Sequence, residues 1–442
     1  MNSIIISFLC FFWNFSFCNT ETMQNTQKAS SQTPIIIVWA GISGLAAAKE
    51  LENAWKQVLI LEAKDTIGGR IDTKTKSGTT FEMWASWIHG DQKNPVADIL
   101  KTQGNSLTYT DFDDLKTYIN GKEVNKESEE DFFEYAEDYP DKSLQKVFDL
   151  FTEEYNITWK EKEYLLFKLK IEIETEFWAG LDKLSFSSID QWKVLNWWDK
   201  LVWGWYEKVI QYLSKWLDIK LNTPVSKIIQ SQTWVQVYDT KGGLYTGEKV
   251  IVTVPLWVLK KWAIQFEPAL SKEKLQAISS LGMGNLHKTF LVFEKSFWED
   301  ITALDRLDTS KATSSLWWEF INLQKLTGQP ILLALHGGES AKEMEKKDTK
   351  TIKKEVLSVL KDIYPEAKEP IDIITSEWHK DNYTLWSYSY LPVWVDGIVY
   401  DILAKREGKL YFAWEHTNAD FPSTTHGAYL SWIRAAKEIL NK

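Results

Sequence analysis

Cysteine is almost absent from this chain of 442 residues, and its two cysteines, Cys10 and Cys18, both lie near the N-terminus. The rest of the chain therefore has no disulfide, no thiolate nucleophile and no cysteine to which a cofactor could be bound covalently. Blocks of Lys and Arg are also missing, and the formal net charge is −10. This charge argues against nucleic-acid binding and is compatible with attraction of cationic ligands.

A long hydrophobic segment is missing as well, because the apolar run from Ile4 to Phe17 is too short to cross a bilayer comfortably. A polar stretch, Asn19 to Thr33, follows it, and Cys18 between them is a candidate for lipidation. We expect residues 1–33 to be an export signal or lipid anchor with a polar tether. The protein would then be exported or anchored in the cell envelope. No Lys or Arg precedes the run, so a cytoplasmic protein with a wrongly assigned start is the alternative.

Glycine is scarce, whereas tryptophan is abundant. The chain has 21 glycines and 24 tryptophans, although a chain of this length typically has roughly 31 glycines. Trp55 and Trp216 follow expected helix ends, where glycine with a positive φ is common. We interpret such tryptophans as UGA codons that the organism reads as glycine; a pseudoenzyme with genuine tryptophans is the alternative. The twelve positions with the most glycine-like surroundings are Trp39, Trp55, Trp84, Trp205, Trp216, Trp234, Trp257, Trp262, Trp386, Trp394, Trp414 and Trp432.

An apolar strand at residues 35–38 leads into a turn that reads WAGISG at residues 39–44. The turn matches the dinucleotide-binding pattern G-x-G-x-x-G except that Trp39 replaces the first glycine. A helix over residues 45–54 and a second strand over residues 57–61 complete a βαβ unit that ends on Glu62. In such a unit the first glycine makes the tight turn, the second admits the pyrophosphate and the third lets the helix pack on the strand. An indole at the first position would fill the space that the turn and the phosphates need.

Two pairs of motifs resemble the FAD-dependent amine oxidase family. The sequence LEAKDTIGGRI at residues 61–71 and FAWEHT at residues 412–417 carry the resemblance, which extends from about residue 34 to the end. The motifs ASWIHG at residues 85–90 and STTHGA at residues 423–428 are most similar to the polyamine oxidase and flavin-dependent histone lysine demethylase branch. With glycine at Trp84, Trp386, Trp414 and Trp432, these motifs become the usual ones of the family. Trp87, Trp298 and Trp378 stand where the family itself has tryptophan.

The resemblance implies an α/β (α+β) fold, with a Rossmann-like FAD-binding domain and an interleaved substrate-binding domain that contains a mixed sheet and a helical insertion. Nucleotide-site motifs occur near both ends of the chain, and residues from about 115 to 200 are charged, aromatic and helix-like. We therefore predict FAD-binding segments at 34–115, 201–285 and 378–442, a helical part of the substrate domain at 116–200 and its sheet at 286–377.

The resemblance also implies non-covalent FAD and no metal site. The helix N-terminus would favour the anionic pyrophosphate, Glu62 would accept hydrogen bonds from the ribose, and the planar guanidinium of Arg70 would suit the phosphates. The residues assigned to the cofactor are Trp39 (as glycine), Ala40, Gly41, Ser43, Gly44, Glu62, Gly69, Arg70, Val225, Trp378, Glu415, Thr424 and Thr425.

Four residues are implied at the reacting centre: Lys288, His89, Tyr388 and Thr424. A lysine in a strand-like segment is usually solvated, but the family resemblance gives Lys288 the role of holding a water against the flavin's reactive nitrogen. Tyr388 and Thr424 would form two walls that steer the amine, and an aromatic face also attracts cations. His89 would be the active-site histidine of polyamine oxidases, with a purely structural histidine as the alternative.

The implied reaction is oxidation of a primary or secondary amine, expected to be a polyamine. The amine gives hydride to the flavin, the imine hydrolyses, and O2 is reduced to H2O2. Glu176 and the acidic run at residues 111–114 are candidates for binding a polycation. An L-amino-acid oxidase would need an arginine for the substrate carboxylate, and Arg70 is already assigned to FAD. We expect a small-molecule amine and O2 as partners, no nucleic acid, and membrane attachment only through the leader; the oligomeric state stays open.

Overall fold

Ile35–Val38 forms strand β1 at the centre of a parallel sheet. The computed structural model describes residues 33–124, 129–193, 195, 198–309, 316–378 and 381–441. The parallel sheet has the order β10-β2-β1-β14-β23, and each neighbouring pair is parallel. Its other strands are β2 (Val58–Leu61), β10 (Ile219–Lys220), β14 (Lys249–Val252) and β23 (Leu410–Phe412). Short, continuously apolar strands are typical of a parallel sheet that is covered on both faces.

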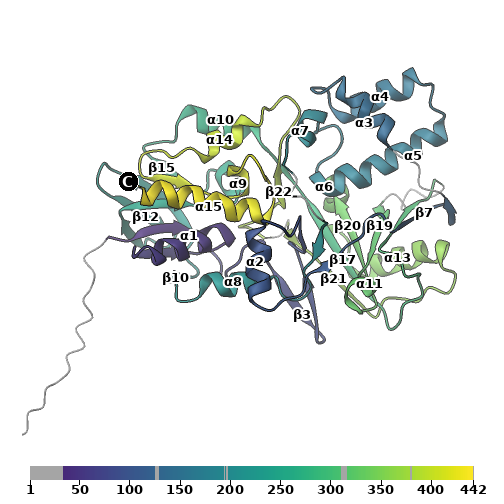
Figure 1. The fold of residues 1–442 in the computed structure, drawn as a ribbon, viewed down its shortest axis with the longest axis horizontal. Coiled ribbons are helices and arrows are strands. Elements are labelled where there is room, and N and C mark those ends of the chain that lie inside the picture. Colours follow the sequence, from purple (N-terminus) through teal and green to yellow (C-terminus); the bar gives the residue numbers. More distant parts are fainter. Residues whose placement is uncertain are drawn as a thin grey trace, which may run out of the picture. The chain divides into compact units, whose positions relative to one another are not determined.

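Helix α1 (Ile42–Asn53) connects β1 to β2 and packs against α8 (Glu207–Ser214) and α15 (Thr425–Leu440). Figure 1 shows α1 and α15 side by side, although they come from opposite ends of the described chain. The buried face of α1 is rich in alanine, which lets the neighbouring helices approach closely. The C-terminal helix therefore supports the turn at the start of α1.

A smaller four-stranded sheet has the order β13-β12-β11-β15. Its strands are β11 (Val225–Gln230), β12 (Val235–Asp239), β13 (Leu244–Gly247) and β15 (Gln265–Glu267). Residues of β11 and β12 share one apolar cluster with β1, with β14 and with the helices α9 (Leu256–Lys260), α10 (Lys272–Ser280) and α14 (Ile398–Ala404). The predicted α/β class with a Rossmann-like part is confirmed.

A third, seven-stranded mixed sheet has the order β21-β17-β20-β19-β18-β7-β8. Helix α13 (Thr349–Ile363) packs its apolar face on this sheet. The pair β7–β18 is parallel and the other pairs are antiparallel. The strands are β7 (Leu115–Ile119), β8 (Lys122–Val124), β17 (Leu286–Val292), β18 (Ala303–Leu307), β19 (Glu319–Asn322), β20 (Ile331–Gly337) and β21 (Asp372–Thr375).

The predicted helical segment at 116–200 is wrong at its beginning, because β7 and β8 add to the edge of the seven-stranded sheet. Neither strand has an alternating burial pattern, so the period-two signal of a half-buried strand was absent from this segment. The rest is mainly helical and has its own apolar cluster; Figure 1 shows α3, α4 and α5 grouped together. These helices are α3 (Glu130–Glu137), α4 (Leu144–Glu154), α5 (Trp159–Leu169), a π-helix (Lys170–Glu174), α6 (Thr175–Phe177) and α7 (Phe186–Asp190).

Short elements connect the sheets near the predicted site. The domain boundaries given above stay predictions. The short elements are β3 (Thr73–Lys76), β4 (Thr79–Glu82), β5 (Trp87–Ile88), α2 (Pro95–Thr102), β6 (Thr108–Tyr109), β9 (Lys200–Leu201), β16 (Gly282–Gly284), α11 (Leu323–Thr327), α12 (Gly338–Glu345), β22 (Tyr388–Tyr390) and a 3-10 turn (Glu415–Thr417).

The predicted leader lies outside the described residues, except for Thr33. Within the described ranges, no helix has the length and apolar character needed to span a membrane. Export, anchoring and the cytoplasmic alternative stay predictions.

Asn94 links the ASWIHG segment to the helix that follows it. Its Oδ1 accepts hydrogen bonds from the N–H groups of Val96 and Ala97, and its Nδ2 donates to the carbonyl of His89. Because Asn94 is fully buried, we expect Asn94→Ala to lower the free energy of unfolding by about 1–2 kcal/mol. Asn94→Asp keeps the cap acceptor but sets a carboxylate oxygen against the His89 carbonyl, so it should also be less stable than the parent. Urea unfolding of the three proteins tests this, and equal stability of Asn94→Ala and the parent would contradict it.

Candidate functional site

The turn between β1 and α1 is held by a buried carboxylate. Glu62, directly after β2, accepts the N–H of Ala40 at 2.7 Å and the N–H of Lys64 at 2.8 Å. Burial raises the pKa of Glu62 to about 7, although the two N–H donors partly oppose this rise. A Cβ atom on Gly44 would lie 2.2 Å from the carbonyl oxygen of Trp39, so this position in α1 requires glycine. The predicted role of Gly44 in helix packing agrees with this geometry, whereas the predicted contact of Glu62 with the ribose stays a prediction.

Two indole rings fill the space above the helix N-terminus. A Cβ atom added to Gly41 would lie 2.5 Å from Trp414 Cη2 and 3.2 Å from Trp39 Cδ1. A Cβ atom added to Gly69 would lie 3.1 Å from Trp39 Nε1. Both tryptophans are buried. The rings of Trp39 and Trp414 therefore stand against the two glycine-containing backbone segments that were predicted to receive the pyrophosphate.

Arg70 and Glu415 form a buried ion pair at this point, with Nη2 and Oε1 3.0 Å apart. Arg70 Nη1 also donates to the carbonyl of Ser387, and Ser389 Oγ donates to Glu415 Oε2 at 2.6 Å. Burial raises the pKa of Glu415, but the Arg70 charge and neighbouring donors outweigh it and lower the pKa to about 2. Glu415 is therefore a permanent anion that holds the guanidinium in place.

Aromatic rings surround the guanidinium. Arg70 Cζ lies 5.2 Å from the ring centroid of Trp414, 5.4 Å from that of Trp84 and 5.5 Å from that of Tyr388. Such distances allow cation–π attraction. Trp84 in turn packs its ring 3.9 Å, centroid to centroid, from that of Trp378. The predicted wall residue Tyr388 thus lies beside the predicted phosphate-binding arginine, and the Trp84 ring packs against both.

Only a small cavity, of about 30 Å³, remains at this centre. Thr424 caps α15, with Oγ1 accepting the Gly427 N–H at 2.9 Å, and Thr425 Oγ1 lies 2.7 Å from the hydroxyl of Tyr206. The structure therefore brings together part of the residues predicted for the flavin and its substrate face. The predicted site residues that line the cavity are Arg70, Tyr388, Glu415, Thr424 and Thr425, and Trp84 and Trp414 line it with them.

A second cavity, of about 160 Å³, adjoins Trp39 on its other side. Val225, predicted for the adenine side, lines it together with Leu61 and Ala63 from the end of β2. Trp257 and Tyr383 also face this cavity. It lies at the carboxyl ends of the parallel strands, where nucleotides bind in folds of this type.

The Lys288 side chain extends from β17 into a buried site that is lined by the segment at the end of β4 and after it. Its Nζ donates to the carbonyl of Glu82 at 3.3 Å and contacts the carbonyl of Trp84 and the hydroxyl of Ser86. Burial lowers the pKa of Lys288 to about 7, with the Glu82 charge opposing this shift. The surface reading of this lysine from its periodicity alone is therefore wrong, and the buried position that the family resemblance implied agrees with the structure.

His89 lies in a different environment and is half exposed. Its Nδ1 is 2.9 Å from Asp199 Oδ2. Desolvation lowers the pKa of His89, but the hydrogen bond to Asp199 and the charges of Asp199 and Glu176 raise it overall. Desolvation raises the pKa of Glu176, and the Asp199 carboxylate raises it further. His89 therefore belongs to an acidic group with Asp199 and Glu176.

The acidic run at 111–114 has a structural role at its last position. Asp114 Oδ2 accepts the N–H and the hydroxyl of Thr302 at 2.9 and 3.2 Å, and it pairs with Lys325. These contacts tie the segment before β7 to β18. Asp111 accepts the Asp113 N–H at 3.2 Å. The site geometry therefore gives no support to polycation binding by this acidic run. Glu176 stays a candidate for binding a polycation.

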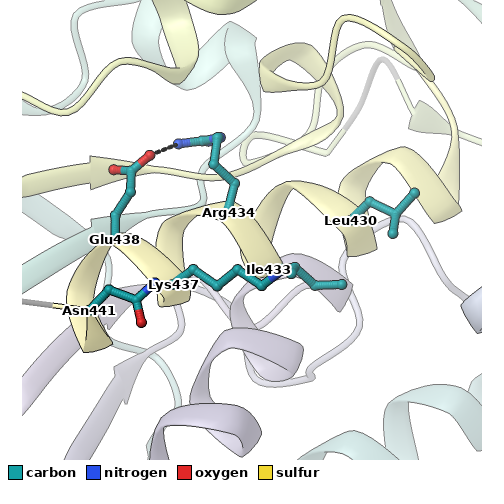
Figure 2. A pocket seen from close by; sticks show the side chains of 6 residues that line it. All are labelled: Leu430, Ile433, Arg434, Lys437, Glu438 and Asn441. Atoms are coloured by element: carbon teal, nitrogen blue, oxygen red, sulfur yellow. Dashed lines mark hydrogen bonds and ion pairs between the residues drawn. The ribbon is translucent and has the colours of Figure 1, made fainter.

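Another hollow, of about 510 Å³, lies along α15 (Figure 2). An ion pair of 3.1 Å between Arg434 and Glu438 crosses part of it. It contains none of the predicted site residues, so its size does not make it the functional site. Its lining residues are Leu430, Ile433, Arg434, Lys437, Glu438 and Asn441.

Residues 42–440 match the family described as flavin containing amine oxidoreductase. The chain is 34% identical to polyamine oxidase 4 of Oryza sativa subsp. japonica, over 93% of this chain and 89% of that protein. It is 31% identical to polyamine oxidase 2 of Arabidopsis thaliana, over 93% and 89%. It is also 30% identical to lysine-specific histone demethylase 2 of Homo sapiens, over 92% of this chain and 53% of that protein. The chain belongs to the flavin-containing amine oxidoreductase family.

The chain is therefore an FAD-dependent oxidoreductase, and the predicted family, enzyme class and non-covalent cofactor are confirmed. The tryptophans that the printed sequence has in this site do not fit FAD, however. The rings of Trp39, Trp84 and Trp414 occupy the space between the helix N-terminus, Arg70 and Tyr388. The backbone and the polar partners match the cofactor, whereas these three side chains exclude it.

Several residues of the site escaped the sequence reasoning. Asp199, the partner of His89, lies in a segment without a recognisable motif, and no sequence signal could have found it. Ser86 is part of the ASWIHG motif, so its proximity to the lysine was open to prediction. Trp178 stacks on Tyr388, with centroids 3.9 Å apart and planes at 27°. Its left-handed backbone at a helix end became visible only in the structure.

The buried Lys288 predicts a defined pH dependence of stability. Its pKa is about 7 when folded and about 10.4 when unfolded, so unfolding takes up a proton between these pH values and stability rises with pH there. Lys288→Met removes this dependence. The parent should gain about 1.4 kcal/mol relative to the variant per pH unit between about pH 7.5 and 10.

Urea unfolding of both proteins at several pH values measures this gain. The series starts above pH 7 because burial also raises the pKa of Glu82 to about 7, and the effect of Glu82 on stability then lies at lower pH. A constant difference in unfolding free energy between parent and variant would contradict the assigned burial of the amine.

Proposed function

We propose that the protein oxidises a polyamine to an imine, with O2 as the electron acceptor and H2O2 as the second product. The observation that carries this proposal is the acidic group that Asp199 and Glu176 form around His89, which belongs to the ASWIHG motif. FAD would supply the electron-accepting chemistry when bound. The chain's own residues would bind the amine, orient it and hold protons.

Charge and aromatic character both support a polycationic substrate. Asp199 and Glu176 place two carboxyl groups around His89, and the net charge of −10 favours approach of cations. Tyr388 lines the small central cavity and offers a ring face that can attract an alkylammonium group. A polyamine has several such groups, so it can contact the acidic group and the aromatic wall at once.

Lys288 is suited to proton handling at this site. With its pKa lowered to about 7, a substantial fraction of the amine is neutral near neutral pH, which an ordinary lysine is not. Its Nζ is fixed by the carbonyls of Glu82 and Trp84. We propose that it positions a water molecule or transfers a proton during the reaction.

An amino-acid substrate has less support. Recognition of an α-carboxylate calls for an available arginine, and Arg70 is paired with Glu415 and the carbonyl of Ser387. Arg306, another buried arginine, pairs with Asp308 and Asp362. Neither guanidinium is available for a substrate carboxylate.

The substrate proposal is tested by anaerobic addition of spermidine to FAD-loaded protein that carries glycine at positions 39, 84 and 414, whose rings occupy the cofactor space, and at position 178, whose ring stacks on Tyr388. We expect the oxidised flavin absorbance to disappear. Asp199→Asn and Glu176→Gln should each raise the KM for spermidine about 10-fold, because each removes a charge contact worth roughly 1.4 kcal/mol. A monoamine of similar size should be affected much less.

Glu343→Gln is a matched control, since Glu343 is an exposed carboxylate paired with Lys346 on helix α12. It should leave the KM unchanged. Unchanged KM values in Asp199→Asn and Glu176→Gln, or equal effects on the monoamine, would contradict the polycation assignment.

A further inference from the structure

We infer that the working protein has glycine at positions 39, 84, 178 and 414, and that loss of these four indoles opens one continuous FAD and substrate site. Trp178 is not among the twelve positions that the sequence pattern selected. The inference rests on FAD binding by the family and not on which amine is oxidised. Two kinds of observation support it: the place of the rings in the site at all four positions, and the backbone conformation at positions 39 and 178.

The four rings follow one another through the expected site. Trp39 and Trp414 both contact the space over Gly41. Trp414 and Trp84 lie on the Arg70 guanidinium, and Trp84 lies 5.1 Å from Tyr388, measured between centroids. The row runs from the pyrophosphate turn to the substrate wall, which is the path that an extended dinucleotide must occupy.

Trp178 closes the far end of this row. Its ring stacks on Tyr388, the wall that should face the amine. Its backbone has φ 57° and ψ 20°, the left-handed conformation that commonly ends a helix with glycine. Nearby, a Cβ atom on Gly284 would lie 2.5 Å from the Trp178 carbonyl oxygen, so two backbone segments already approach closely here. Glycine at 178 would keep this backbone and uncover the ring of Tyr388.

The backbone itself supports glycine, independently of the cofactor. Tryptophan rarely adopts a positive φ, because its Cβ atom then meets the backbone. At Trp39 φ is 95°, beyond the range that side-chain-bearing residues tolerate. Within the described ranges the tryptophans with positive φ are Trp39, Trp55, Trp178, Trp216, Trp262 and Trp394.

Two of these tryptophans occupy the glycine position of a complete helix-ending motif. After α1, the N–H of Trp55 donates to Glu52 and the N–H of Lys56 donates to Leu51. After α9, Trp262 and Ala263 make the equivalent bonds to Leu259 and Val258. This pair of bonds defines the Schellman motif, whose left-handed residue is usually glycine. Trp55 is 89% exposed, so no packing explains an indole there.

Hydrogen bonding separates these tryptophans from genuine ones. Indole N–H groups at Trp87, Trp298 and Trp317 donate to Thr110, Asn322 and Glu355, at 3.1, 2.8 and 3.1 Å. Among the described residues, the buried indole N–H groups of Trp39 and Trp414 have no acceptor. Buried tryptophan normally satisfies its N–H. Trp192 and Trp318 also lack an acceptor, but neither lines a cavity of the expected site, and we assign no change to them.

The test compares four proteins made from synthetic genes and loaded with FAD. Two of them are the chain as written, which has the printed sequence with all its tryptophans, and the fourfold Trp→Gly variant at 39, 84, 178 and 414. The other two are the threefold variant that keeps Trp178, and a Trp298→Gly/Trp317→Gly control. After removal of free FAD, the fourfold and threefold variants should retain about one FAD per chain, and the chain as written less than a tenth of that. The threefold variant should oxidise amine at least 10-fold more slowly than the fourfold variant.

Thermal unfolding gives a second readout that needs no cofactor. Trp55→Gly and Trp262→Gly, both outside the site, should each raise Tm by about 1–3 °C by relief of backbone strain, whereas the control should lower it. Stoichiometric FAD in the chain as written, a colourless fourfold variant, or lower Tm in both single variants would overturn the inference. A fourfold variant that binds FAD but is not reduced by spermidine supports the inference and refutes the polyamine proposal.

Discussion

The close passage of backbone at the turn between β1 and α1 sets the geometry of the whole site. The turn must leave the central strand, let α1 pack on the sheet and still present N–H groups to a ligand. Gly44 permits the packing, since a Cβ atom there would lie 2.2 Å from a carbonyl oxygen. Glu62 fixes the other side through the N–H of Ala40. A bulky side chain at position 39 conflicts with both demands, while the surrounding backbone keeps the form that glycine would give it.

A second constraint connects the mixed sheet to this turn. Lys288 on β17 reaches the carbonyls of the segment after β4, and the same segment continues into the motif that contains His89. Burying an amine is costly, and the cost appears as its lowered pKa. The lysine is therefore a structural link between the sheet and the turn, and its lowered pKa suits the proton transfer that we propose for it.

The sequence allowed much of the fold and site to be predicted, because the motifs combine local backbone needs with chemistry. The parallel strands, the crossover helix and the placement of Arg70 beside Glu415 follow from such motifs. The partnership of His89 with Asp199 joins residues 110 positions apart and has no local signal. Strands β7 and β8 were missed because the composition of this segment favours helix, whereas pairing with the neighbouring strands of the sheet makes it extended. Trp178 was missed because its helix end became visible only from its φ angle.

The most direct test of the account is the peptide mass across residues 35–49 in protein purified from the cells in which this gene occurs. Glycine and tryptophan differ greatly in mass, so one peptide distinguishes them at position 39. We predict the glycine mass there, and also in the peptides that contain positions 84, 178 and 414. Tryptophan at position 39 in the natural protein would contradict the account, because the ring would then close the turn to FAD.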